Sequence, residues 1–146
     1  MINLNTFSER LSELMQDKGV NAPKLAEEVG CKRNTINRYL EGVFAPSLNA
    51  VVKLADYFGC TLDFLLALDD ENRAEKFAPC PPFAERFAFM FEHFKKKKSE
   101  LRDEKKIPES AIYNWLRGET TPSADNVALI AEFFGCTVDF LVGREI

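Results

Sequence analysis

The chain contains one sequence pattern twice, and this duplication limits the folds that are open to it. Residues 7–67 align without a gap on residues 83–143, and 19 of the 61 aligned pairs are identical. The offset is 76 residues throughout, so that Gly42 corresponds to Gly118. An ungapped match of this length indicates that one folding unit has been duplicated. A chain of 146 residues is therefore expected to form two small domains.

The two copies set the expected domain boundaries. We predict a first domain over residues 1–69, a linker over residues 70–82 and a second domain over residues 83–146. The linker is polar at first and ends in Pro79-Cys80-Pro81-Pro82, which is typical of a connecting segment. Its first half is also compatible with a helix.

Helix start and stop signals divide each copy into five short helices. In the first copy, Thr6-Phe7-Ser8-Glu9 predicts a capping box at the start of the first helix. A third helix is expected from about Arg33 to Leu40. No strand-like alternation of apolar and polar residues is present, so we predict an all-α fold with two tandem five-helix domains. The other expected caps and stops are Gly19, Asn21, Gly30, Gly42, Ser47, Gly59 and Thr61.

The composition argues against several other classes of protein. One histidine and four scattered cysteines provide neither a disulfide framework nor a zinc site. The chain has no G-x-S-x-G motif and no glycine-rich phosphate loop, so we expect no enzyme, no metal and no cofactor. It also has no run of about 18 apolar residues and no secretory signal, so we expect no membrane contact and a cytoplasmic location.

A pattern of known type lies in the middle of the first copy. It reads Asn21-Ala22-Pro23-Lys24-Leu25-Ala26-Glu27-Glu28-Val29-Gly30, then Cys31-Lys32-Arg33-Asn34-Thr35-Ile36-Asn37-Arg38-Tyr39-Leu40-Glu41-Gly42, followed by Pro46-Ser47 and residues 54–66. In this order and spacing the chain resembles the Cro/lambda-repressor (XRE) family of helix-turn-helix regulators, over nearly the whole of each copy. The resemblance implies two lambda-repressor-like domains that bind double-stranded DNA, with the helix near residues 33–40 in the major groove.

The residue types in this pattern fit such a unit. A wedge between the second and third helices is expected from Leu25, Ala26, Val29 and Ile36, and Gly30 permits a left-handed turn between them. Ile36 and Leu40 are expected to face inward, with Tyr39 partly buried. The opposite face would then carry Arg33, Asn34, Asn37 and Arg38.

Those four polar residues are a suitable set for reading DNA. Arginine pairs bidentately with guanine and asparagine with adenine. The alternative interpretation is an ordinary solvated helix face. The resemblance also implies phosphate contacts, which we expect at Asn21, Ala22, Lys32 and Thr35.

The loop Val43-Phe44-Ala45 departs from the family, which often places basic residues there. Its apolar character implies either a modest affinity for DNA or a contact with protein, and of the two we favour a protein contact at Phe44.

The second copy keeps the scaffold but changes the reading face. Gly30 becomes Lys106, so the turn must be strained or built differently, and Ala26 becomes Arg102, an awkward residue at a helix crossing. Of the four residues at the reading positions, Glu109 carries the wrong charge for phosphates. The other three are candidate DNA contacts: Ser110, Tyr113 and Asn114.

Positive charge gathers elsewhere in the second copy. The run Lys95-Lys96-Lys97-Lys98, with Lys105 and Lys106 nearby, would either follow a phosphate backbone or form a solvated helix end. The second copy is therefore expected to be a weak DNA-binding half or a domain for pairing and support. Phe89 lies outside the apolar stripe of its helix, which suggests a buried surface against the first copy or another chain.

The sequence thus predicts a DNA-binding transcriptional regulator, a repressor by family habit, acting as a homodimer or as a pseudo-dimer of its two copies. A domain for a small-molecule effector is not evident. The alternative is a protein-interaction module, such as an antitoxin-like or anti-repressor protein. The net charge of −4 supports this alternative, because attraction to phosphates supplies most of the non-specific affinity for DNA.

Overall fold

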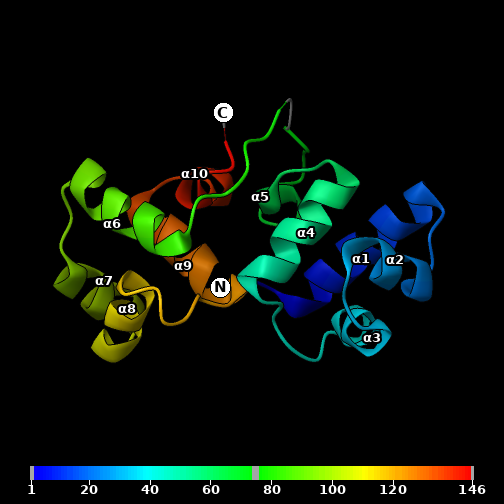
Figure 1. Ribbon diagram of the computed structural model, residues 1–146, viewed down its shortest axis with the longest axis horizontal. Coiled ribbons are helices and arrows are strands. Elements are labelled where there is room, and N and C mark those ends of the chain that lie inside the picture. The colour runs from blue at the N-terminus through cyan, green and yellow to red at the C-terminus, as the bar shows by residue number, and fades with distance from the viewer. Residues whose placement is uncertain (1, 74–75, 146) are drawn as a thin grey trace. The chain divides into compact units, whose positions relative to one another are not determined.

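The computed structural model describes residues 2–73 and 76–145, which form ten α-helices and no β-sheet (Figure 1). The chain divides into two compact units that meet between residues 73 and 76. The all-α prediction is therefore confirmed. Within the two described ranges, no helix is long and apolar enough to cross a membrane.

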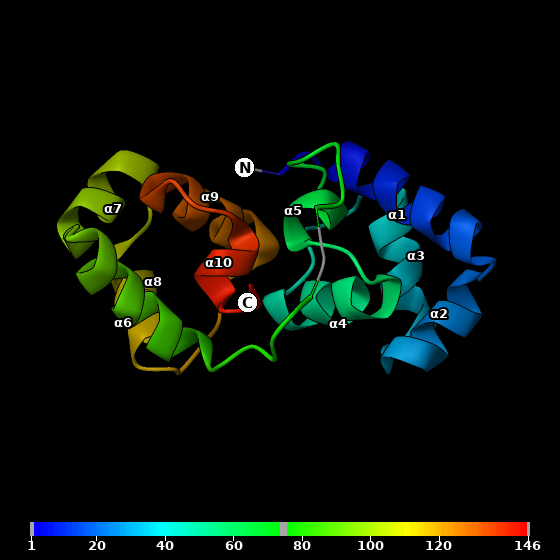
Figure 2. The same ribbon diagram turned by 90° about the horizontal axis from the view of Figure 1, so that it is seen from above.

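Each unit contains five helices, seen from above in Figure 2. Unit 1 contains α1 (Leu4–Lys18), α2 (Ala22–Val29), α3 (Arg33–Glu41), α4 (Leu48–Phe58) and α5 (Leu62–Leu65). Unit 2 contains α6 (Phe83–Phe94), α7 (Lys98–Lys105), α8 (Glu109–Leu116), α9 (Ala124–Phe134) and α10 (Val138–Val142).

The 76-residue repeat of the sequence is also a repeat of the helices. Helices α7, α8, α9 and α10 each begin 76 residues after α2, α3, α4 and α5. The first helix of unit 2 is the exception, because α6 begins three residues later than the repeat would place it. Pro81 and Pro82 precede it, and a proline restrains the residue before it to an extended conformation.

Local caps start and end most helices of unit 1 as predicted. The side chains of Asn21, Ser47 and Thr61 each accept a backbone N–H from the first turn of the following helix. Gly30 and Gly59 end α2 and α4 in the left-handed conformation, at φ 75° and 65°.

The predicted capping box at Thr6 is wrong. Helix α1 begins at Leu4, and the Asn3 side chain accepts the N–H groups of Asn5 and Thr6. Asparagine is at least as good an N-cap as threonine, so the earlier cap starts the helix and Thr6 lies inside it.

The two units bury the same positions of the repeat. In both, all five helices contribute buried aliphatic or aromatic side chains, and the third helix packs on the first and second. Equivalent buried pairs are Phe7 and Phe83, Leu25 and Leu101, Ile36 and Ile112, Val51 and Val127, and Leu65 and Leu141.

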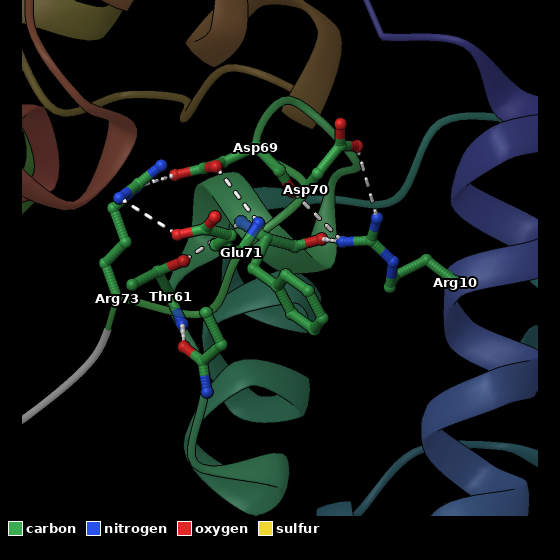
Figure 3. A network of polar contacts seen from close by, with 8 residues as sticks. Arg10, Thr61, Asp69, Asp70, Glu71 and Arg73 are labelled. Carbon is green, nitrogen blue, oxygen red and sulfur yellow. Dashed lines mark hydrogen bonds and ion pairs between the residues drawn. The ribbon is translucent and has the colours of Figure 1, made fainter.

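An arginine at the same position of each copy ties the first helix to the last. The Arg10 guanidinium donates to the carbonyl oxygen of Asp69 at 3.2 Å (Figure 3). It also donates to the carbonyl oxygen of Phe64 and lies 4.0 Å from the centre of the Phe64 ring. In unit 2, Arg86 donates to the carbonyl oxygen of Leu141 at 3.1 Å and to that of Phe140. The arginine of the repeated Phe-x-Glu-Arg motif is therefore structural.

Each end of the segment between the copies packs on the unit to which it belongs. Arg73 pairs with Asp69 at 2.8 Å and with Glu71 at 3.2 Å (Figure 3). The Asn72 side chain accepts the Thr61 N–H. At its other end, the Ala78 N–H donates to the carbonyl oxygen of residue 144 at 2.8 Å. Residues 70–73 form no helix, and residues 74 and 75 lie outside the described ranges.

Alanine at Gly42 is expected to destabilise unit 1 more than alanine at Gly118 destabilises unit 2. Both glycines are left-handed, at φ 71° and 74°, so alanine costs about 1 kcal/mol at either position. At Gly42 the new Cβ would also lie 3.2 Å from Asn5 Oδ1 and 3.4 Å from Ser8 Oγ, whereas at Gly118 its nearest neighbour is Ala84 Cβ at 3.7 Å. Urea unfolding followed by circular dichroism measures the loss in the free energy of unfolding for both variants. Equal losses would contradict the close approach of α1 to Gly42.

Candidate nucleic-acid interface

Helices α2 and α3 form the wedge that the sequence predicts. Leu25, Ala26 and Ile36 are buried, and Val29 is half-buried. The left-handed Gly30 donates its N–H to the Ala26 carbonyl oxygen at 2.9 Å, and this bond closes the turn between the two helices. The turn holds α3 at a fixed angle to α2 with one face toward solvent.

The solvent face of α3 carries the four predicted base-reading residues. Arg33, Asn34 and Arg38 are exposed, and Asn37 is half-buried. Arginine side chains, which donate hydrogen bonds, and asparagine side chains, which donate and accept them, thus lie on one face of α3. The other side of this helix is packed against the core. The structure brings these residues together on one helix face.

The buried side of α3 differs from the expectation in one respect. Tyr39, predicted to be partly buried, is only 3% exposed, and Leu40 is the half-buried residue. The Tyr39 ring lies edge-on to Phe7 and Phe44, with ring centres 6.1 and 5.6 Å apart. Burial raises the pKa of the Tyr39 phenol, so the hydroxyl remains protonated at neutral pH.

The C-terminal end of α3 is anchored to α1. The Ser8 hydroxyl is buried and lies 2.6 Å from the Tyr39 carbonyl oxygen and 2.8 Å from that of Leu4. Because a single side chain bridges the two helices, the orientation of α3 depends on α1 as well as on α2.

The residues predicted to contact phosphates lie at the N-terminal ends of α2 and α3. Asn21 is exposed and Ala22 half-buried, although Asn21 Oδ1 already accepts the Lys24 N–H at 3.0 Å. Lys32 is exposed at the N-cap of α3, which has no side-chain cap, and Thr35 is half-buried in the first turn. An uncapped N-terminus leaves backbone N–H groups for an outside acceptor.

Two charged residues near this surface were missed by the sequence reasoning. Glu41 is exposed and follows Asn37 and Arg38 by four and three positions, so it shares their helix face; helical spacing alone would have revealed it. Lys53 of α4 acts electrostatically on the Cys31 thiol in the α2–α3 turn, although burial dominates and raises the pKa of that thiol. No local signal places Lys53 there, because it lies on a different helix.

The corresponding face of unit 2 is altered as predicted. Ser110 and Tyr113 are exposed, while Asn114 Oδ1 accepts from Arg117 Nη2 at 2.6 Å. Arg102 is half-buried, and its guanidinium lies 2.9 Å from Asp103 Oδ1 and 3.6 Å from Glu109 Oε2. The turn keeps its left-handed shape, with Lys106 at φ 56° where unit 1 has glycine.

The two candidate protein contacts are exposed phenylalanines that pack against neighbours of their own unit. Phe44 is 38% exposed beside Tyr39, and Val43 next to it is 55% exposed. Phe89 is 41% exposed and lies between Arg86, 4.5 Å from its ring centre, and the stacked His93 ring at 5.0 Å. These contacts account for part of the surface of each ring.

Two helices joined by a tight turn, with the second presenting a polar face, define a helix-turn-helix unit, and the chain holds two of them. Comparison with known proteins agrees. Residues 10–71 match the family model of the Cro/C1-type HTH DNA-binding domain, and residues 92–141 match a helix-turn-helix model. An uncharacterized HTH-type transcriptional regulator of Archaeoglobus fulgidus is 34% identical over 63 residues, which cover 43% of this chain and 90% of that protein. The chain belongs to the family of helix-turn-helix transcriptional regulators, and the resemblance to Cro/lambda-repressor proteins is confirmed.

Two further relatives are phage-derived. The cryptic phage CTXphi transcriptional repressor RstR of Vibrio cholerae is 30% identical over 70 residues, which cover 48% of this chain and 63% of the repressor. The SPbeta prophage-derived uncharacterized HTH-type transcriptional regulator YonR of Bacillus subtilis is 33% identical over 60 residues, which cover 41% of this chain and 56% of that protein. The chain therefore spans less than two thirds of either relative. No solved structure matches the chain significantly.

Proposed function

We propose that unit 1 binds operator DNA with α3 in the major groove and that Arg33, Asn34, Asn37 and Arg38 read the base edges. The observation that carries this proposal is the polar face of α3, which is presented to solvent by a helix packed on its other side. Arginine and asparagine are the side chains that best discriminate guanine and adenine in that groove.

The phosphate contacts in this proposal come from the N-terminal ends of α2 and α3. Asn21, Ala22, Lys32 and Thr35 lie there, and we add Lys53 because it lies close to the turn between these helices. Such contacts position the recognition helix without specifying sequence.

We infer that the protein represses transcription as a homodimer. One of its relatives is named a transcriptional repressor. Helix-turn-helix proteins commonly bind as dimers to half-sites about 34 Å apart. Because unit 2 lacks the reading set of unit 1, a second reader has to come from a second copy of the chain. A protein with this function would be located in the cytoplasm. Phe44 and Phe89 are the candidate residues for the contact between the two chains.

The alternative function, a protein-interaction module, is supported by the net charge of −4 and by the exposed apolar loop of Val43 and Phe44. Membership of a family of transcriptional regulators favours DNA binding instead. In the proposed function, the loop contributes to pairing between chains.

Selection from random duplex DNA tests the proposal. We expect a palindromic site, bound with an affinity that falls steeply with salt, since each phosphate contact contributes about 0.9 to the log–log slope. An asymmetric bipartite site would show that both units of one chain read bases. Weak binding to all duplexes without a preferred site would contradict the proposal and favour the interaction module.

A further inference from the structure

Unit 2 carries lysines at positions where unit 1 has no charge. Six uncharged residues of unit 1 around α2 are replaced by lysines around α7, the equivalent helix. In chain order the pairs are Gly19 and Lys95, Val20 and Lys96, Asn21 and Lys97, Ala22 and Lys98, Val29 and Lys105, and Gly30 and Lys106. Positive charge has thus been added around one helix while it has been lost from the reading face.

Two of the six lysines have a structural role. Lys96 Nζ donates to the Phe133 carbonyl oxygen at 2.6 Å and attaches the α6–α7 connection to α9, while Lys105 Nζ lies 2.9 Å from Glu132 Oε1 and attaches α7 to α9. The other four side chains are exposed at the two ends of α7, and we call them the α7 lysines: Lys95, Lys97, Lys98 and Lys106. Eight residues at 1.5 Å per residue place these ends about 12 Å apart.

Two of the α7 lysines occupy backbone positions that favour glycine. Lys95 and Lys106 have φ angles of 54° and 56°, in the left-handed region where unit 1 has Gly19 and Gly30. A lysine is strained there, and such strain is retained where the side chain serves a purpose that glycine cannot.

The helix dipole does not account for the lysines at the start of α7. Lys97 is the N-cap and Lys98 the first residue of the helix, where the dipole is positive and a cation is unfavourable. The Glu100 carboxylate, which accepts the Lys97 N–H at 3.0 Å, offsets part of this charge. An ordinary solvated helix end would explain Lys95, at the C-terminus of α6, but not Lys97 and Lys98.

We propose that α7 crosses the phosphate backbone of duplex DNA and that the α7 lysines bind phosphates without reading sequence. In helix-turn-helix units the first helix of the pair crosses the backbone, and lysines at both of its ends would reach phosphates on either side of the crossing. The proposal concerns phosphate contacts alone and assigns no base reading to unit 2. The proposal deepens the proposed function and rests on it in taking DNA as the ligand.

The double variant Lys97→Gln/Lys98→Gln of the full chain tests the proposal on a duplex of random sequence. We expect the slope of log K against log salt to become shallower by about 1.8, which is about 0.9 for each lost phosphate contact. The change in affinity between about 50 and 200 mM salt then shrinks about 12-fold. The matched control Arg73→Gln/Lys76→Gln removes two exposed cations near the junction of the units, and its slope should equal that of the wild type.

Lys106→Gly separates a phosphate contact from a structural role. Glycine relieves the left-handed strain, so the melting temperature should rise. The salt slope should nevertheless become shallower by about 0.9. A rise in stability with an unchanged slope would show that Lys106 does not contact phosphate.

Three outcomes would overturn the proposal: a slope unchanged from the control in the double variant, a loss of affinity confined to a selected site, or lysine-dependent binding to phosphatidylglycerol vesicles without any effect on duplex DNA. A wild-type protein that prefers no site would contradict the proposed function, but the slopes on random duplex DNA would still decide the role of the α7 lysines.

Discussion

Replacing Arg33 and Arg38 together by alanine is expected to abolish selective binding to the operator while the fold is kept. Each bidentate arginine–guanine pair contributes about 1–3 kcal/mol of discrimination, so the double variant should lose about 2–6 kcal/mol on its selected site. The two effects should add, because the side chains are exposed and five positions apart on α3. Titration of labelled selected and scrambled duplexes measures both affinities.

The control for this experiment is Arg73→Ala/Lys76→Ala, which removes the same charge from exposed positions outside the helix-turn-helix. It should leave the ratio of the affinities for the selected and the scrambled duplex unchanged. If the Arg33 and Arg38 variant lost equal affinity for both duplexes, the two arginines would be phosphate contacts and base reading by α3 would be contradicted.

The second large effect is expected at a buried ion pair in unit 2. Asp139 and Arg144 are 4% and 0% exposed, and Asp139 Oδ1 accepts from Arg144 Nη1 at 2.8 Å. The guanidinium also lies 3.6 Å from the centre of the Phe77 ring. Asp139→Asn removes the negative charge of this pair while the guanidinium stays buried, so it should cost about 3–5 kcal/mol of the free energy of unfolding. Trp115 is the only tryptophan and is buried in unit 2, so its fluorescence during urea unfolding reports this unit.

Two further variants separate the buried charge from other effects. Asp63→Asn changes the equivalent position of unit 1, which is half-buried, and it should leave the Trp115 transition unchanged. The apolar double variant Asp139→Leu/Arg144→Met should recover much of the lost stability, because it removes both charges. A cost below about 1 kcal/mol for Asp139→Asn would show that water or another group solvates the cation.

The features that were predictable from the sequence are those that depend on a few neighbouring residues. Asn21, Ser47 and Thr61 cap their helices, and Gly30 and Gly59 end theirs, because caps and left-handed turns are determined within one helical turn. The starts of α7, α8, α9 and α10 then follow from those of α2, α3, α4 and α5 by the offset of 76 residues. At the start of α1 two caps compete, and only the structure shows that Asn3 prevails over Thr6.

Burial on α3 was less predictable because it depends on residues that are distant in the chain. Helical spacing places Tyr39 at the edge of the buried face, but Phe7 from α1 and Phe44 from the following loop cover its ring. The position of Lys53 beside the α2–α3 turn likewise follows from tertiary packing.

In the second copy, some backbone conformations and buried partners could not be predicted from the sequence. The exchange of Gly30 for Lys106 left open whether the turn is strained or rebuilt, and the structure keeps it left-handed. The repeat identifies Asp139 as the equivalent of Asp63, but it does not predict that Asp139 is buried. Nothing near Asp139 in the sequence predicts that residue 144 supplies its buried partner. The candidate base contacts on α3 were predictable by chemistry, because their exposure requires only that the opposite face be apolar.

Arg38→Lys tests whether α3 of unit 1 reads bases. Lysine keeps the positive charge but lacks the planar fork that pairs bidentately with guanine. In parallel selections from random duplex DNA, the account predicts that the variant loses base preference at one position of each half-site and keeps the preference at the others. An identical selected site for the wild type and the variant would contradict the account.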